Sequence, residues 1–270
     1  MSEEIIKEAV ILAAGLSTRL RDHIKEKSKV LCQIADRPLL AFPVEVLMHA
    51  GVEEFKIVAN QFNHIFVRKI MKELFEVKFE VIVNRFPELG NGYSALLGAR
   101  HVHSEIFILS MGDHIYAPSV IKKILRRARS EFDIIVGGDS SPRYIDVREA
   151  TKILTRKDQV IRIGKNLREF THVDIGVFVV KKSVLNEFIS LSTRKITWSD
   201  IINRAVERGY KVVIADICGD YWTEIDTPND LQEVLSGMRR MVIKNVLKQL
   251  EFRFRYEVME RTFQKEQLIL

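Results

Sequence analysis

Two positively charged side chains, Arg19 and Lys29, follow the first strongly apolar segment of the chain. This segment, V-I-L-A-A-G-L-S-T-R-L, passes from aliphatic residues through small ones to a hydroxyl pair and an arginine. Small residues let a ligand approach the backbone, whose amide groups can then bind an anion. The guanidinium of Arg19 has forked donors that suit phosphate oxygens, and a loop that folds back brings Lys29 to the same anion. The pattern predicts a loop that binds the phosphates of a nucleotide.

Two common phosphate-binding motifs do not fit this loop. No Gly-Lys-Ser/Thr closes it, which excludes a P-loop, and positions 15, 17 and 20 are Gly, Ser and Leu instead of the three glycines of a dinucleotide-binding turn. Taken alone, A-A-G-x-S-T-R is also compatible with an ordinary strand-to-loop turn. The two cations at this spacing, followed by V-L and R-P-L-L, favour phosphate binding.

Two aspartates form a second candidate group. Asp113 in S-M-G-D-H and Asp226 in W-T-E-I-D-T-P each follow an apolar or aromatic segment typical of a strand. Either residue alone would more often be a turn or helix-cap residue. Together with the opening loop, they suit a hard divalent cation bound through carboxylate and phosphate oxygens. His114 is expected to be a structural hydrogen-bonding residue, because Mg²⁺ prefers oxygen ligands.

The elements that must position these residues alternate between strands and helices. After the strand at 10–12, β-branched and apolar runs predict strands at 55–59, 77–83, 106–110, 133–137, 151–155, 160–163, 173–180 and 211–217, and R-K-D-Q predicts a hairpin turn between 151–155 and 160–163. Helical spacing and capping residues predict helices at 38–50, 65–75, 94–102, 119–130, 182–191, from 197 or 199 to 208, and from 227 onward. Pro43 indicates that the first of these helices starts near Phe42 or kinks at that point. We therefore expect an α/β fold, with a Rossmann-like, three-layer, mixed but mostly parallel sheet and helices on both faces. Ligands bind such sheets beyond the carboxyl ends of the strands, where the opening loop and Asp113 lie.

Composition and charge exclude several other classes of protein. Apolar residues make up 47% of the chain and charged residues 29%, which is enough for a core and a soluble surface. A net charge of +6 does not indicate nucleic-acid binding, and we expect none. Two cysteines exclude a disulfide framework or a multi-cysteine zinc site, and we expect two reduced core thiols. Neither a signal peptide nor a membrane span is recognisable, so we expect a cytoplasmic protein.

The opening loop resembles a known signature. L-A-A-G-L-S-T-R-L, then K-V-L and R-P-L-L, is similar to the signature of the sugar-phosphate nucleotidyltransferase superfamily, L-A-A-G-x-G-T-R-L, then P-K-x-L and K-P-L-L. Ser17 replaces the usual second glycine and Ser28 the usual proline. The resemblance covers most of residues 8–235, a nucleotidyltransferase domain with a GT-A-like fold. It implies that a phosphorylated acceptor attacks the α-phosphorus of a nucleoside triphosphate and expels pyrophosphate.

The resemblance also implies roles for individual residues. Arg19 and Lys29 would bind the triphosphate, Lys165 the phosphate of the acceptor, and Asp113 and Asp226 a catalytic Mg²⁺. The nucleotide-binding residues would be Leu12, Ala13, Ala14, Gly15, Ser17, Thr18, Asn91, Gly92, Ser94 and Asp113. The acceptor-binding residues would be Lys165, Asp139, Asp174 and Gly176. For G-N-G-Y-S an ordinary helix N-terminus is an equal alternative, and an isolated lysine is usually a solvated surface residue.

Several shorter strings narrow the resemblance. M-G-D-H-I-Y, G-N-G-Y-S, P-R-Y-I-D-V-R-E-A-T-K, I-G-K-N-L-R-E-F and V-D-I-G-V-F are similar to CTP:inositol-1-phosphate cytidylyltransferases. Those enzymes make CDP-inositol for a heat-protective inositol phosphodiester and are often fused to a membrane transferase. Since no membrane span is recognisable in this sequence, the chain is expected to be a stand-alone form. Two alternatives stay open. One is a hexose-1-phosphate uridylyl- or thymidylyltransferase, and the other is a non-catalytic regulatory subunit that binds a nucleotide.

The composition changes at Ser236. Residues 236–270 contain eight Lys/Arg and four Asp/Glu, so 8 − 4 = +4 of the net charge lies in this tail. An apolar stripe predicts a basic amphipathic helix over Met238, Met241, Val242, Asn245, Val246, Leu250 and Phe254. We expect it to pack on the domain or on a second copy of the chain; binding to anionic lipid is the alternative. The expected partners are CTP or another NTP and a phosphorylated polyol or sugar, with a homodimer and a membrane-bound CDP-alcohol transferase as further candidates.

Overall fold

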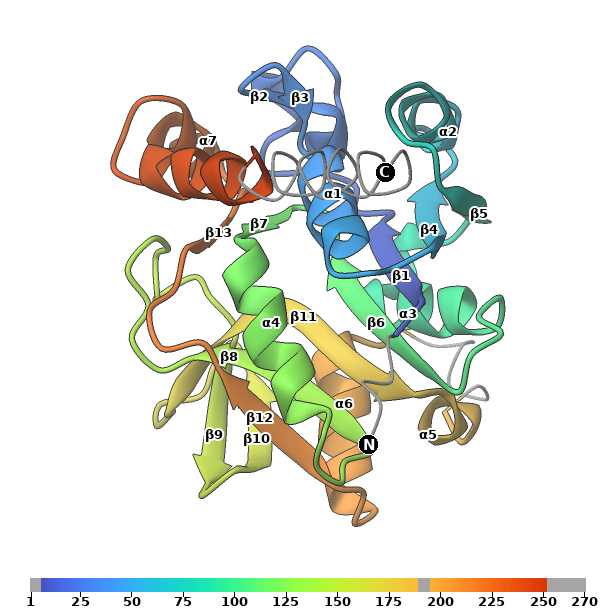
Figure 1. The fold of residues 1–270 in the computed structure, drawn as a ribbon, viewed down its shortest axis with the longest axis vertical. Helices are drawn as coiled ribbons and strands as arrows, with labels where there is room; N and C mark the ends of the chain where they lie inside the picture. The colour runs from blue at the N-terminus through green and yellow to red at the C-terminus, as the bar shows by residue number, and fades with distance from the viewer. Residues whose placement is uncertain (1–5, 189–194, 252–270) are drawn as a thin grey trace, which may run out of the picture.

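The main sheet of the molecule is mixed. In the computed structural model, which describes residues 6–188 and 195–251, a 9-stranded sheet has the order β5-β4-β1-β6-β11-β8-β12-β10-β9 (Figure 1). Its strands are β1 (Glu8–Ala13), β4 (Glu54–Asn60), β5 (Lys78–Asn84), β6 (Ile106–Met111), β8 (Ile134–Asp139), β9 (Lys152–Arg156), β10 (Gln159–Gly164), β11 (His172–Lys181) and β12 (Val212–Asp216). Two small pairs are β2 (Gln33–Ile34) with β3 (Arg37–Pro38), and β7 (His114–Tyr116) with β13 (Trp222–Glu224).

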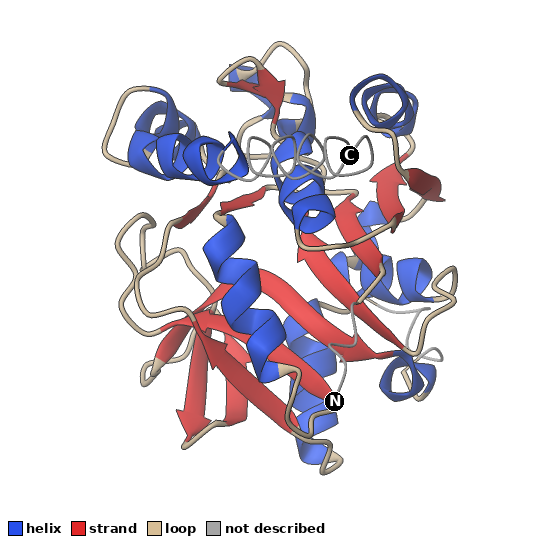
Figure 2. Ribbon diagram, viewed as in Figure 1, coloured by secondary structure: helices blue, strands red, loops and turns tan. Residues whose placement is uncertain are grey.

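Helices cover both faces of this sheet (Figure 2). They are α1 (Ala41–His49), α2 (His64–Leu74), α3 (Asn91–Ala99), α4 (Pro118–Arg127), α5 (Lys182–Asn186), α6 (Trp198–Glu207) and α7 (Pro228–Leu235). Alternate residues of β1 point to opposite faces, since Ile11 packs in the cluster that contains α1 and α4, whereas Val10 packs with α3 and α6. A strand buried on both faces explains why the sequence around Val10 is continuously apolar rather than alternating.

The sheet is mixed, as expected, but it is mostly parallel only in its first half; in the second half β12 runs parallel to β8 and the other pairs are antiparallel. The hairpin expected between 151–155 and 160–163 is confirmed as β9 and β10. Strands β5, β4, β1 and β6 are parallel neighbours. Strand β11 runs antiparallel to both β6 and β8, and β9 and β10 form an antiparallel hairpin that also pairs with β11. The short connection through Lys157, whose φ is +57°, leaves no room for the crossover that a parallel pair would need.

Most of the observed helices and strands lie within a few residues of the expected ones. The first helix begins at Ala41, close to the start near Phe42 that Pro43 indicates, and Pro38 belongs to β3 and pairs with Gln33. The helix expected over 182–191 ends as α5 at Asn186, and residues 189–194 lie outside the described part. The α6 helix begins as expected, with Thr197 and Asp200 forming a reciprocal capping box.

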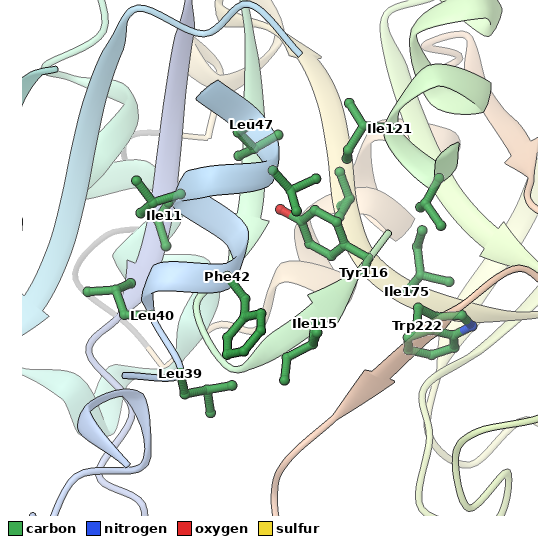
Figure 3. Packing of buried hydrophobic residues seen from close by; sticks show 14 of the residues in the cluster. Ile11, Leu39, Leu40, Phe42, Leu47, Ile115, Tyr116, Ile121, Ile175 and Trp222 are labelled. Carbon is green, nitrogen blue, oxygen red and sulfur yellow. The ribbon is translucent and has the colours of Figure 1, made fainter. Parts of the chain in front are cut away.

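Packing around α1 fixes the short strand β7. Figure 3 shows Phe42 and Leu47 of α1 beside Ile115 and Tyr116 of β7, with Trp222 of β13 on the far side. These side chains are 1% exposed or less. Because β7 starts directly after Asp113, this packing determines where that aspartate lies.

The described part of the C-terminal tail is helical from 240 to 251 and belongs to the main core. The prediction is confirmed for Val242, Val246 and Leu250 of the stripe, which are buried. Ile243 is buried beside them. Met238 and Met241 were expected on the same stripe but are 61% and 51% exposed, so that part of the prediction is wrong. Phe254 lies outside the described residues. The packing therefore shows no boundary at position 235.

Candidate active site

The loop after β1 is held by two buried asparagines at and after the end of β4. Asn60 donates from Nδ2 to the carbonyl oxygens of Ala14 and Gly15, at 3.1 and 3.2 Å. Asn63 donates from Nδ2 to the carbonyl oxygen of Ala13 at 2.9 Å. These hydrogen bonds fix the shape of the loop, and Ala14 and Gly15 line a cavity of about 280 Å³.

Ser17 occupies a backbone conformation that favours glycine. Its φ is +55°, in the left-handed region, which explains why the resembling signature has a glycine at this position. The Ser17 hydroxyl oxygen accepts a hydrogen bond from the backbone N–H of Lys29 at 2.9 Å. The serine therefore ties the opening loop to the segment that carries the second cation, which a glycine could not do.

The ammonium group of Lys29 lies between the carboxylates of Asp113 and Asp226 and forms an ion pair with each. The three side chains are 13%, 18% and 22% exposed, respectively. Burial alone would lower the pKa of Lys29, but the two carboxylates outweigh it and hold that pKa above its ordinary value. Burial would likewise raise the pKa of Asp113, and Lys29 with His114 instead holds it well below its usual range. The cluster is therefore ionised at neutral pH.

Local structure explains how the two aspartates meet. At the end of β6, the N–H of Gly112 donates to the carbonyl oxygen of Leu12 at 2.9 Å, and a Cβ on Gly112 would meet that same oxygen at 2.9 Å. The missing side chain thus lets Asp113 lie beside the opening loop. Asp226 directly precedes α7, and its N–H donates to Oδ2 of Asp230 in the capping box of that helix, at 3.2 Å.

Arg19 reaches the same cluster from its outer side. Its Nη2 is 2.6 Å from Oδ2 of Asp226, and its Nη1 is 3.4 Å from Oε2 of Glu149. The Arg19 side chain is 44% exposed and is not part of the cavity wall. The structure thus brings together four of the residues singled out from the sequence.

The other residues of the opening loop have different surroundings. Leu12 lines the cavity, as expected for a nucleotide-binding residue. Ala13 is only 1% exposed and packs in the core, so its side chain contacts no ligand. Thr18 is exposed and lies outside the cavity wall.

The G-N-G-Y-S segment opens α3, and two of its three predicted residues line the cavity. Asn91 and Ser94 do so, and their side chains accept hydrogen bonds from the Trp198 N–H at 2.8 Å and from Asn84 Nδ2 at 2.9 Å. Gly92 does not line it. A Cβ at Gly92 would lie 2.6 Å from the backbone of Thr197, so this position has no room for a side chain. We correct its role to close packing between α3 and the start of α6.

Some of the predicted acceptor-binding residues line the cavity and others do not. Lys165 and Asp174 line the cavity, near Thr151. Gly176 does not, although its position matters for His114. The assignment of Asp139 is wrong: this residue is 0% exposed, and its carboxylate accepts hydrogen bonds from Trp222 Nε1 at 2.7 Å and the Gly219 N–H at 2.6 Å. Asp139 is therefore a structural anchor of the loop that leads to β13.

His114 is the structural hydrogen-bonding residue that the sequence suggests. Its Nδ1 is 2.7 Å from Oδ1 of Asp113, and its Nε2 is 3.4 Å from Oε2 of Glu224. Its ring stacks on Trp222, with 6.2 Å between centroids, and lies against Gly176, where a Cβ would be 2.6 Å from the ring. Burial would lower the pKa of His114, but the Asp113 and Glu224 carboxylates raise it to about 9, so the imidazole is protonated at pH 7.

Glu224 was missed by the sequence reasoning. It lines the cavity and lies directly opposite His114 in the β7–β13 pair. Burial raises the pKa of Glu224 to about 7, and burial also raises that of Asp174 to about 6. The signal that could have identified Glu224 is its position two residues before Asp226 in W-T-E-I-D, since alternate residues of a strand share a face.

The two aspartates fit the expected Mg²⁺ by their chemistry. Mg²⁺ usually takes one or two carboxylates, with substrate phosphates and waters as its remaining ligands. Asp113 and Asp226 already bind one cation between them, the ammonium of Lys29, beside a loop suited to phosphate. No cluster of three or more His, Cys, Asp or Glu side chains suited to a metal occurs in residues 6–188 and 195–251, so phosphate oxygens would complete the coordination.

The two cysteines are free. Cys32 is buried as expected, whereas Cys218 is exposed, so the expectation of two core thiols is wrong for Cys218.

Among the helices that the structure describes, none is both long and apolar enough to cross a membrane.

Residues 9–187 match the family described as the MobA-like NTP transferase domain. Two curated relatives are named "Bifunctional IPC transferase and DIPP synthase". The protein from Thermococcus kodakarensis is 32% identical over 90% of this chain and 52% of its own length. The protein from Aquifex aeolicus is 33% identical over 90% of this chain and 54% of its own length. The chain thus spans about half the length of these relatives.

Solved structures with the same fold include the inositol-1-phosphate CTP transferase from T. maritima. It superposes with a TM-score of 0.79 at 33% identity, over 87% of this chain and 97% of that one. A putative glucose-1-phosphate thymidylyltransferase from Bacillus anthracis superposes with a TM-score of 0.74 at 20% identity, over 86% and 95% of the two chains, and shows the fold alone. The α/β class and the GT-A-like nucleotidyltransferase fold expected from the sequence agree with both.

Proposed function

Because this chain belongs to the family of MobA-like NTP transferase domains, we propose that it transfers a cytidylyl group from CTP to inositol 1-phosphate, giving CDP-inositol and pyrophosphate. The T. maritima neighbour and the two bifunctional relatives support this choice through their names. The observation that carries it is the cluster of Lys29, Asp113 and Asp226 beside the loop after β1.

The acceptor needs no general base in this reaction. A phosphate monoester carries about −1.5 to −2 charges at pH 7 and is itself the nucleophile. It attacks the α-phosphorus of CTP in line and displaces pyrophosphate, so catalysis consists of positioning and charge neutralisation. We assign Lys165, which lines the cavity, to the phosphate of the acceptor.

The remaining roles follow from the charges of the site. We assign Arg19 and Lys29 to the oxygens of the triphosphate, and Asn91 and Ser94, which line the cavity, to the base. Asp113 and Asp226 would hold Mg²⁺, which, when bound, neutralises charge on the phosphate oxygens. Without ligands, the two carboxylates hold the pKa of Lys29 above its ordinary value, so its ammonium group is a charged donor for an arriving triphosphate.

A matrix of nucleotides and acceptors tests this proposal. Pyrophosphate release is measured for CTP, UTP, dTTP and GTP with inositol 1-phosphate, glucose 1-phosphate and mannose 1-phosphate, with Mg²⁺ or EDTA. We expect the highest kcat/KM for CTP with inositol 1-phosphate, and only with Mg²⁺. A preference for UTP or dTTP with a hexose 1-phosphate would identify a nucleotide-sugar synthase instead, and binding of CTP without any pyrophosphate release would identify a regulatory subunit.

Substitutions in the cluster test the assigned roles. Arg19→Ala and Asp113→Ala should each lower kcat/KM by about 100-fold or more, because each removes a group that neutralises or binds phosphate charge. Arg21→Ala is the matched control, since Arg21 is 56% exposed and its ion-pair partner is Asp22. Near-wild-type turnover in either cluster variant, with the fold intact by circular dichroism, would contradict the assignment.

A further inference from the structure

One part of the cavity wall carries two acidic side chains, Asp174 of β11 and Glu224 of β13, both near His114. On the loop side the Lys29 ammonium is already paired with Asp113 and Asp226, and Lys165 adds a second cation. The acidic wall of Asp174 and Glu224 disfavours a second phosphate or carboxylate group of a ligand and favours a group that donates hydrogen bonds.

Glu224 is held in place by a single polar partner, the protonated imidazole of His114. Its Oε2 is 3.4 Å from Nε2 of His114, and the two residues are direct cross-strand neighbours. Within the described residues, no other N–H or O–H group of the protein donates to the Glu224 carboxylate, which lines the cavity. His114 is in turn fixed by Asp113, by the stacked ring of Trp222 and by the backbone of Gly176.

Such a group favours a ligand that donates hydrogen bonds. A partly buried carboxylate with one long contact leaves most of its acceptor positions unpaired, and a ligand that supplies donors removes that cost. The hydroxyl groups of a polyol are neutral donors and meet both requirements of this wall. Asp174 also has one donor, the N–H of Gly176 at 2.9 Å on Oδ1.

We propose that Glu224 is a specificity-determining residue whose carboxylate accepts a hydrogen bond from a hydroxyl group of the acceptor. The acceptor's phosphate then lies toward Lys165 and its polyol ring toward the acidic wall. This inference rests on the proposed function, because it places the acceptor in this cavity. It selects neutral polyol phosphates over acceptors that carry a second anionic group.

The test compares Glu224→Ala and the isosteric Glu224→Gln with the wild-type protein. Acceptors are inositol 1-phosphate and a set of deoxy analogues, each lacking one ring hydroxyl, and pyrophosphate release gives kcat and KM. We expect Glu224→Ala to raise the KM for inositol 1-phosphate at least tenfold and to leave the KM for CTP within twofold. The KM of Glu224→Gln for inositol 1-phosphate should lie between those of the wild type and Glu224→Ala, because glutamine keeps an acceptor oxygen without the charge.

The deoxy analogues separate a direct contact from a structural effect. The analogue that lacks the bound hydroxyl should be a poor substrate for the wild type and should lose nothing further in Glu224→Ala, because the contact is already absent. Glu73→Gln, on the exposed face of α2, is the control and should match the wild type on every acceptor.

Two results would overturn the inference, and they differ from each other. In the first, Glu224→Ala and Glu224→Gln are both shown to be folded by their thermal unfolding transitions, and their kcat/KM falls by the same factor for inositol 1-phosphate and for every deoxy analogue. Glu224 then acts only through the charged cluster, and the proposed function stands. If the wild type releases no pyrophosphate with any acceptor, the proposed function and this inference fail together. If a hexose 1-phosphate is the substrate, its deoxy analogues replace those of inositol in the same comparison.

Discussion

Gly176 lies directly against the imidazole ring of His114, and its backbone has a φ of +72°. Both properties exclude a side chain: the left-handed conformation strains an L-residue, and a Cβ would be 2.6 Å from the ring. At the residue scale, the site therefore depends on the absence of a side chain at Gly176 as much as on its charges. The glycine in V-D-I-G-V-F, implied by resemblance to contact the acceptor, instead makes room for the residue that holds Glu224.

Gly176→Ala is a direct test of this contact. The added methyl group must displace the His114 ring, so we expect the free energy of unfolding to fall by about 1 to 3 kcal/mol. Gly164→Ala is the matched control, since a Cβ there meets nothing within 4 Å and the change should cost about 0.5 kcal/mol or less. Urea unfolding followed by fluorescence measures both variants, and equal stability of the two would contradict the packing argument.

The residues show where sequence reasoning succeeds and where it fails. Arg19, Lys29, Asp113 and Asp226 could be selected because their spacing follows a known signature, and the structure places them together. Asp139 has the same residue type, but its partner Trp222 lies far along the chain, and nothing local in the sequence marks it as buried. Spacing predicts which residues share an edge of the sheet, whereas burial depends on contacts between distant segments.

At the scale of the elements, most helices and strands could be predicted because their apolar patterns are long. The small pair of β7 and β13 could not, since each strand has three residues and the two come from distant parts of the chain. That pair creates the contact between His114 and Glu224, and this explains why Glu224 was missed. The antiparallel direction of β11 was missed for a similar reason, because alternation of strands and helices does not reveal it, whereas the β9–β10 hairpin could be predicted from its short turn.

Strand β1 is tied at its start to the turn before β6, and this connection should depend on pH. The Glu8 carboxylate accepts hydrogen bonds from the backbone N–H groups of His103, at 3.0 Å to Oε2, and of Ser104. Burial alone would raise the pKa of Glu8, but these hydrogen bonds outweigh it and lower that pKa below its ordinary value. A carboxyl group with a lowered folded-state pKa stabilises the protein above its unfolded pKa, and the contribution disappears as the pH falls through the folded pKa.

Glu8→Gln should therefore destabilise the protein most at neutral pH. We expect the free energy of unfolding to fall by about 1 to 3 kcal/mol at pH 7, and the difference from wild type to shrink as the pH approaches about 3. Urea titrations at several pH values measure it. Glu53→Gln, a surface residue paired with Lys7, serves as the control. A difference that stays constant over this range would show that the Glu8 charge is not responsible.

At the scale of the whole molecule, the C-terminal helix at 240–251 is part of the main core. Val242, Ile243, Val246 and Leu250 pack in the cluster that also contains α1 and α4. Arg239, 6% exposed, pairs with Asp230 of α7 at 2.6 Å. Among the described basic residues of this segment, Arg240, Lys244 and Lys248 are exposed, whereas the apolar side of the helix is covered by the domain.

Removing apolar volume from this helix should destabilise the whole domain. Ile243→Ala is expected to lower the free energy of unfolding by about 2 to 5 kcal/mol, because Ile243 is 4% exposed. Met241→Ala, at a position 51% exposed, should change it by about 0.5 kcal/mol or less. Thermal or urea unfolding measures both. A single cooperative transition that shifts with Ile243→Ala would confirm one folding unit, and an unchanged transition would show that the helix is separable.

The pairing of β6 with β11 has a consequence for how such a protein can diversify. The loop after β1 and the start of α3, which we assign to the nucleotide, follow the parallel strands β1 and β5 on one side of this pairing. Of the residues that line the cavity from the other side, Asp174 lies in β11, Thr151 directly precedes β9 and Lys165 directly follows β10, and we assign Lys165 and Asp174 to the acceptor. Substitutions and insertions between β8 and β11 can therefore alter which acceptor is bound while the nucleotide half keeps its hydrogen bonds. A single rigid sheet can in this way keep one reaction constant through evolution while its acceptor changes.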